Sequence, residues 1–212
     1  MTAPDAWALE TEQQVLDAAL RIAPRLGWGR ATLLAAARDF GLSPAEADLL
    51  FPNGARDLAA LLSRRHDAAA LAALPDPANL KIRERIRVAV IARLDSAAAD
   101  QAALRRWLGF LSLPPNLPLA LRLVWESADH LWRWAGDTAT DENHYSKRAI
   151  LSGILIGTLV QDLTAGRGAA LETLDARIQN VIDFEKWKAG IKPSDFAKDV
   201  AGALARLRFG QA

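Results

Sequence analysis

Apolar side chains recur at helical spacing along most of the chain. Val15, Ala18, Ala19 and Ile22 follow the period of three to four residues that places side chains on one face of an α-helix. Clusters of glycine and proline interrupt this pattern and mark the ends of the segments. The first predicted helix carries the apolar residues at 15–22 and ends at 27–29. The others, in chain order, are 33–40, 44–50, 55–74, 80–96, 101–112, 118–135, 140–163, 171–182 and 195–209.

The composition supports the same fold class. The 212 residues include 43 Ala and 33 Leu, which favour helices, but only 17 Val and Ile, which favour strands. We therefore predict an all-α fold. Breaks in the pattern divide the chain into an N-terminal region (residues 1–74), a helical bundle (75–190) and a C-terminal amphipathic helix (191–212).

Charge and cysteine content exclude several function classes. Lys and Arg number 26 against 25 Asp and Glu, so the formal net charge of +1 gives no general attraction to nucleic acid or anionic membranes. The absence of cysteine from the sequence excludes a disulfide scaffold, a thiolate nucleophile and zinc–thiolate sites. Any contact with a charged partner would have to be local.

The first third of the chain resembles a helix-turn-helix unit. Thr32 can cap a short helix, Gly41 ends it, and Ser43-Pro44 supplies the cap and first-turn proline of the next. A DNA reader needs basic or amide side chains on that second helix, but residues 42–51 contain none and carry two acids, Glu46 and Asp48. Residues 10–66 hold seven Arg and seven acids. We predict that this unit serves packing and binds no nucleic acid.

No catalytic motif is present in the sequence. The three histidines stand apart, and we expect His66, which follows Arg64-Arg65, on a solvated face. We predict no catalytic residue, no metal site and no cofactor. The most apolar window, residues 149–160, is shorter than the roughly 20 residues that cross a bilayer, so we expect a buried helix there.

Aromatic residues concentrate in the middle of the chain. Four of the seven tryptophans fall between Trp107 and Trp134, and Trp125 and Trp132 lie seven residues apart beside Leu131. This wide aromatic face has two interpretations. It can be an ordinary large core, or it can line a pocket for an apolar ligand between bundle helices.

Several motifs, in order, resemble one known family. They are found at residues 41–43, 50–54, 107–111, 113–118, 132–137, 140–149, 161–162 and 174–178. Together they look like the ubiquinone-biosynthesis accessory protein family, the ninth Coq protein. Where that family usually has a Trp-Tyr pair in its signature, this chain has His144-Tyr145.

The resemblance implies a fold and a function. It implies a TetR-repressor-like bundle, a homodimer, no enzymatic activity, and binding of an isoprenoid quinone precursor or a phospholipid. It also implies a partner, the di-iron demethoxyubiquinone hydroxylase, to which the family presents substrate. By analogy to the fold, the dimer would form through the helices at 140–163 and 171–182. Because no signal peptide precedes the first helix, we expect a cytoplasmic protein, peripheral on the inner membrane of a bacterium.

Three sets of candidate site residues follow. We expect the lipid cavity between the helices at 101–112, 118–135 and 140–163, lined by Trp107, Trp125, Leu131, Trp132, Leu151 and Leu155. The candidate partner surface consists of Asp137, Asp141, His144, Tyr145, Lys147 and Arg148, which could instead be capping acids and a solvated basic turn. The candidate membrane contacts are Phe196, Val200, Leu204 and Leu207, a stripe that could instead pack on its own bundle.

Two other functions compete with the lipid-binding hypothesis. One is a TetR-type transcriptional regulator with a hydrophobic effector pocket, which needs a basic recognition surface. The other is a small-molecule enzyme with an unrecognised site.

Overall fold

The computed structural model describes residues 3–138 and 142–190, and these form nine α-helices, three single-turn 3-10 helices and no strand. The α-helices are α1 (Ala3–Leu26), α2 (Arg30–Arg38), α3 (Pro44–Leu50), α4 (Ala55–Ala73), α5 (Ile82–Ser96), α6 (Gln101–Leu111), α7 (Leu117–Trp134), α8 (Glu142–Ala165) and α9 (Arg167–Gly190). The predicted all-α fold class is confirmed. The TetR-like arrangement stays a prediction.

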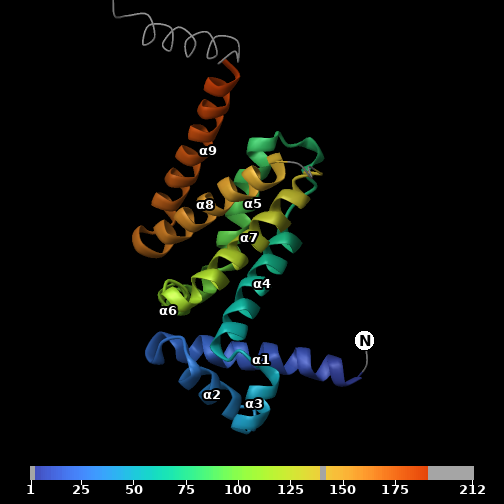
Figure 1. Ribbon diagram of the computed structural model, residues 1–212, viewed down its shortest axis with the longest axis vertical. Helices are drawn as coiled ribbons and strands as arrows, with labels where there is room; N and C mark the ends of the chain where they lie inside the picture. The colour runs from blue at the N-terminus through green and yellow to red at the C-terminus, as the bar shows by residue number, and fades with distance from the viewer. Residues whose placement is uncertain (1–2, 139–141, 191–212) are drawn as a thin grey trace, which may run out of the picture.

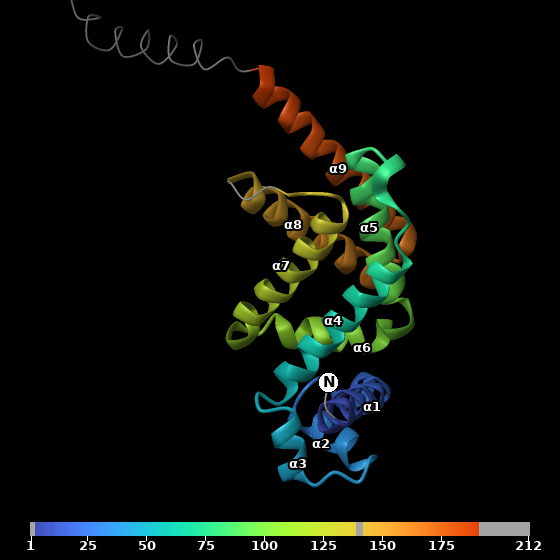
Figure 2. The ribbon, with the colours of Figure 1, turned by 90° about the vertical axis from the view of Figure 1, so that its right-hand side faces the viewer.

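The helices gather toward the two ends of an elongated molecule. Figure 1 shows α1, α2 and α3 at one end and α5, α7, α8 and α9 toward the other, with α4 running between them. The view turned by 90° shows α6 crossing the middle beside α4 (Figure 2). The long helix α4 therefore belongs to both ends.

Local sequence signals set most helix ends. Ser43 caps α3 in a capping box: its Oγ accepts from the Glu46 backbone N–H, and the Glu46 carboxylate accepts from the Ser43 backbone N–H at 2.8 Å. The Thr32 cap was a wrong prediction. Thr32 is buried within α2, which begins at Arg30, and its Oγ1 donates to the Gly27 carbonyl at 2.7 Å.

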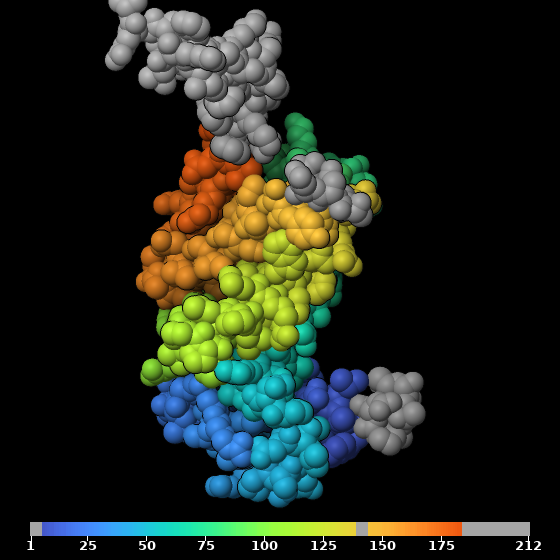
Figure 3. Space-filling model, viewed as in Figure 1, coloured from blue at the N-terminus to red at the C-terminus, as the bar shows by residue number. Residues whose placement is uncertain are grey.

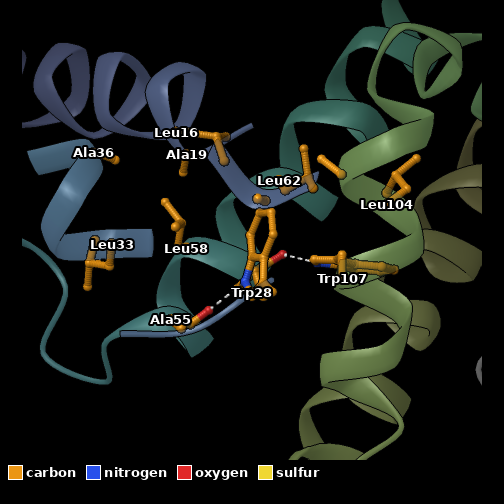
Figure 4. Packing of buried hydrophobic residues seen from close by; sticks show 14 of the residues in the cluster. Leu16, Ala19, Trp28, Leu33, Ala36, Ala55, Leu58, Leu62, Leu104 and Trp107 are labelled. Carbon is orange, nitrogen blue, oxygen red and sulfur yellow. Dashed lines mark hydrogen bonds between the residues drawn. The ribbon is translucent and has the colours of Figure 1, made fainter. Parts of the chain in front are cut away.

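One apolar core joins the N-terminal helices to the bundle. It includes Leu16 of α1, Leu33 of α2, Leu58 of α4 and Leu104 of α6. Two tryptophan side chains also form hydrogen bonds with backbone carbonyls in the first two turns of α4. Trp28 Nε1 donates to the Ala55 carbonyl and Trp107 Nε1 to the Ala59 carbonyl, both at 3.1 Å, as the dashed lines in Figure 4 show. The core thus crosses residue 74, and the predicted domain boundaries stay untested.

A second core holds α8 against α5, α7 and α9. Leu151 and Leu155 of α8 pack there with Leu131 of α7 and Leu174 of α9. By length and composition, residues His144–Ala165 could cross a membrane, and 39% of the apolar window is buried in the fold. The expectation of a buried helix at 149–160 therefore holds for one face of α8 only. The other face exposes Ile150, Ile156 and Val160.

The C-terminal segment falls outside the described residues. This applies to the predicted helix at 195–209 and to the four candidate membrane contacts, Phe196, Val200, Leu204 and Leu207. Asp141 of the candidate partner surface also lies outside them.

Candidate functional site

The bundle contains an apolar cavity of about 400 Å³ that is open to solvent on one side. Its walls come from α6, α7 and α8, the three helices expected from the sequence, and α4 and α5 complete it. A volume of this size is typical of pockets that hold a small apolar molecule. The wall side chains are mostly leucine, valine and isoleucine, with Trp107 on one side.

The outer end of the cavity is apolar and exposed. Leu117 and Leu121 from α7 and Ile156 and Val160 from α8 line the cavity, and all four are exposed. Leu121 is the most open of them, with 63% of its surface accessible. Figure 3 shows α7 and α8 side by side on one face of the molecule. An exposed apolar patch of this kind typically marks a surface that contacts a ligand, a membrane or another protein.

The inner, buried part of the cavity wall includes three polar residues among apolar ones such as Leu94 and Leu111. The polar residues are Ser63 of α4, Arg93 of α5 and Ser127 of α7, and all three are buried. Asp67 connects two of them, since it accepts from Arg93 Nε at 2.6 Å and from Ser127 Oγ at 2.8 Å. The cavity therefore combines a long apolar wall with a few fixed polar groups.

The structure separates the six candidate lipid residues. Trp107 and Leu155 line the cavity, whereas Trp132 and Leu151 line a smaller one of about 130 Å³ bounded by α5, α7, α8 and α9. Leu131 is buried in the second core. Trp125 packs against Tyr145, with ring centroids 6.2 Å apart.

Several cavity residues were missed from the sequence. Leu117, Leu121 and Val124 lie at positions i, i+4 and i+7 of α7, a spacing that could have marked them. Arg93 carries no such signal, because only the folded bundle shows that its side chain is buried. The lipid-binding role of all these residues remains to be tested.

Three of the six candidate partner residues, Asp137, Lys147 and Arg148, form an ion-pair network with Asp129. Only 2% of the Arg148 side chain is exposed, and its Nε and Nη1 donate to Asp129 at 2.6 Å and Asp137 at 2.9 Å. Lys147 Nζ lies 2.5 Å from Asp137 and 5.5 Å from the centre of the Trp132 ring. A solvated basic turn is therefore the wrong description of Arg148.

The carboxylates of this network are held ionised. Burial alone would raise the pKa of Asp137, but hydrogen bonds from Lys147 and Arg148 outweigh it and bring the pKa below its ordinary value. Burial would likewise raise the pKa of Asp129, and its bonds with Arg148 and Arg133 lower it overall. The network thus stabilises the start of α8.

Beside this network, Tyr145 remains at the surface. Its side chain is 64% exposed, and the half-buried His144 meets it edge-on at 5.2 Å between ring centroids. Of the six candidates, this aromatic pair and Lys147 are the described residues that a partner could reach.

His66 does not lie on a solvated face, so that expectation was wrong. Only 2% of its surface is exposed, because the turn Ala98–Asp100 lies against α4 and places Asp100 Oδ2 at 2.7 Å from Nε2. Burial and the charge of Arg93 lower the pKa of His66 to about 4, although Asp100 acts in the opposite direction. Within the described part of the chain, no cluster of three or more His, Asp or Glu side chains could hold a metal ion.

Helix α3 presents an acidic and apolar surface. Asp48 is engaged by Arg30 in two hydrogen bonds of 2.8 and 2.9 Å, and Leu49 is 80% exposed. A DNA-reading helix carries the opposite character.

Comparisons with known proteins agree with the sequence motifs. The COQ9 family model matches residues 117–185, which contain four of the motifs noted above. The chain is 28% identical to the rat ubiquinone biosynthesis protein COQ9 over 94% of its own length and 68% of the relative's. The chain is 29% identical to the human COQ9 protein over 94% of its own length and 67% of the relative's. A frog relative, COQ9-A of Xenopus laevis, is 30% identical over 68% of this chain and 48% of its own length.

The relatives contradict the expected location. They are named as mitochondrial proteins of eukaryotes, including rat, frog and human. The expectation of a cytoplasmic protein peripheral on a bacterial inner membrane is therefore corrected. It rested on the absence of a signal peptide, and that absence does not identify a compartment.

Proposed function

We propose that this protein is an accessory protein that carries a lipid in its apolar cavity. The proposal starts from the family of the chain, since it belongs to the COQ9 family of ubiquinone-biosynthesis proteins. In this proposal the lipid is an isoprenoid quinone precursor, with a phospholipid as the other candidate. The protein presents the precursor to the demethoxyubiquinone hydroxylase and performs no chemistry itself.

The cavity of about 400 Å³ is the observation that carries the proposal. Exposing each five-carbon isoprene unit to water costs roughly 3–4 kcal/mol, so such a molecule leaves a membrane only for another apolar environment. The wall of the cavity supplies that environment, and its exposed mouth lets a tail longer than the cavity continue along α7 and α8.

Blocking the mouth of the cavity tests lipid binding. Ile156→Trp places a large ring among the mouth residues, and we expect it to reduce co-purified lipid, measured by native mass spectrometry, at least tenfold. Ile150→Trp is the matched control, because Ile150 is a similarly exposed residue of the same helix that lines the smaller cavity instead of this one. A wild-type protein that is reproducibly free of lipid and takes up no quinone analogue would refute the proposal.

Presentation to the hydroxylase is assigned to the exposed Tyr145 and its half-buried neighbour His144. The double substitution of both residues by Ala should impair co-purification of the hydroxylase and change the melting temperature little, since Tyr145 is largely exposed. An unchanged pull-down would remove this surface from the proposal.

Membrane contact and dimer formation belong to the same proposal. Deleting residues 194–212 should weaken co-sedimentation with anionic liposomes if Phe196, Val200, Leu204 and Leu207 contact the membrane. The homodimer through α8 and α9 is tested by the mass of the protein in solution. Neither result affects the lipid-binding experiment.

The competing transcriptional regulator is not favoured. It shares the cavity, but α3 offers Glu46, Asp48 and Leu49 where a regulator needs basic side chains. The relatives are named for ubiquinone biosynthesis.

A further inference from the structure

The buried part of the cavity wall has hydrogen-bond donors that the protein does not use. Arg93 Nε is bonded to Asp67 at 2.6 Å, but among the described residues no acceptor takes its two Nη groups. The Ser63 hydroxyl likewise has no hydrogen-bond partner in the described part of the chain. Neither group is among the fully enclosed unpaired atoms, which belong to His66, Ser152, Asp162 and Arg167. Both therefore reach accessible space, and both residues line this cavity.

These donors belong to buried residues of the cavity wall. Ser63, Arg93 and Ser127 are buried, whereas the apolar residues at the mouth, such as Leu121 and Ile156, are exposed. The polar residues are therefore buried and the apolar residues at the mouth exposed, which is the opposite of an apolar pocket with a polar entrance. A molecule with one polar end and one apolar end fits it when the polar end enters first.

The charge beside these donors selects a neutral polar group. Arg93 is neutralised by the buried Asp67, which also accepts from Ser127, and His130 Nδ1 lies 3.9 Å from it. A phosphate or carboxylate placed here would add a second buried anion near Asp67, and such a charge is costly without a second cation. A carbonyl, phenol or methoxy oxygen accepts the Arg93 and Ser63 donors without adding charge.

We infer that Arg93 and Ser63 form a recognition site for a ring that bears neutral oxygen acceptors, bound ring-first with its apolar tail toward the mouth. This inference rests on the proposed lipid-binding function and adds the head group and the direction of binding. Trp107 on the cavity wall offers an aromatic surface for the ring to pack on.

Three probes with tails of the same length test the inference. They are a dimethoxy-methyl-benzoquinone with a decyl tail, decylbenzene, which lacks the oxygens, and decyl phosphate, which is anionic. Wild-type protein should bind the quinone about 10- to 100-fold more tightly than decylbenzene, because a site built to donate hydrogen bonds discriminates against a molecule that lacks the acceptors. Decyl phosphate should bind more weakly than the quinone.

Arg93→Lys separates recognition from folding. Lysine keeps the positive charge beside Asp67 but lacks the forked Nη donors. We expect quinone affinity to fall at least tenfold and decylbenzene affinity to stay within about threefold. Arg87→Lys is the matched control, since Arg87 lies on the same helix in an exposed pair with Asp175 and away from the cavity. Ser63→Ala, a smaller change, should weaken quinone binding about two- to tenfold and keeps the test available if Arg93→Lys does not fold.

Each contrary outcome has its own meaning. Equal affinities for quinone and decylbenzene, unchanged in both variants, would overturn the inference and leave lipid binding intact. Tighter binding of decyl phosphate that depends on Arg93 would also overturn it, because the head group would then be an anion. If no probe binds to the wild-type protein, the proposed function fails together with the inference.

Discussion

Arg148 shows how a single buried charge organises the start of α8. Its guanidinium bridges Asp129 and Asp137 in a largely buried site, so removing it leaves Asp129 paired with Arg133 alone and Asp137 paired with Lys147 alone. Breaking a buried ion pair in this way typically costs about 3–5 kcal/mol. We expect Arg148→Met to lower the free energy of unfolding by about that amount, measured by urea denaturation.

The matched control for this substitution is Arg87→Met. Arg87 makes the same kind of bond with Asp175 at 2.7 Å, but on the surface, where such pairs contribute about 1 kcal/mol or less. If both substitutions cost the same, the Arg148 network is not a stabilising unit. In that case its residues would have to be explained by function alone.

His66 makes stability depend on pH in a defined window. Its pKa in the folded protein is about 4, below the 6.5 of an unperturbed histidine, so the unfolded chain binds more protons between these values. Stability is therefore fully present above pH 6.5 and is lost as the pH falls toward 4. From these two values we expect this group to remove about 2–3 kcal/mol between pH 7 and pH 4.5.

The variant His66→Gln isolates this contribution from that of the carboxylates. Glutamine can donate to Asp100 but does not titrate, so the unfolding free energy of the variant should fall less steeply between pH 7 and pH 4.5. Identical pH profiles for the two proteins would show that His66 is not held neutral.

At the scale of the element, the character of α3 decides between two functions. The nearby Arg30 of α2 is already paired with Asp48 of α3. The surface of α3 also carries the acidic Glu46 and the exposed Leu49. Phosphate contacts supply most non-specific DNA affinity, so we expect no mobility shift with genomic DNA even at low salt. A shift that weakens steeply as salt rises would instead support the regulator.

The helices themselves were largely predictable from the sequence. The segment 44–50 was predicted to the residue, because Ser43, Pro44 and Glu46 are local signals that act within one helical turn. The start of α2 was misplaced by three residues, because the hydroxyl of Thr32 bonds back to Gly27 rather than forward into its own helix.

The candidate site was less predictable, for reasons that lie in long-range packing. Trp107 and Leu155 line the large cavity, whereas Trp132 and Leu151 line a different one. The sequence gives the apolar face of a helix, but which neighbour covers each part of that face depends on how the helices cross. The burial of His66 and Arg93 could not be predicted for the same reason, because their partners, Asp100 and Asp67, lie in other elements.

At the scale of the whole molecule, the cavity depends on both sides of residue 74. Ser63 belongs to α4, which shares its core with α1 and α2, whereas the other walls come from α5 to α8. We therefore expect one cooperative unfolding transition, with far-UV circular dichroism and tryptophan fluorescence giving the same midpoint in urea.

A bound ligand should raise the free energy of unfolding of the whole described fold, because the fold unfolds in that single transition. With the decyl-tailed benzoquinone at about 100 times its dissociation constant, the free energy of unfolding should rise by about 2.7 kcal/mol. Ile156→Trp should show no such rise, because the mouth residue that it replaces admits the ligand. Two separate transitions, only one of which moves with the quinone, would mean that the N-terminal helices fold apart from the cavity. The shared core around Trp28 and Trp107 would then contribute little to holding the two parts together, and α4 would be a connection between independent domains rather than a wall common to both.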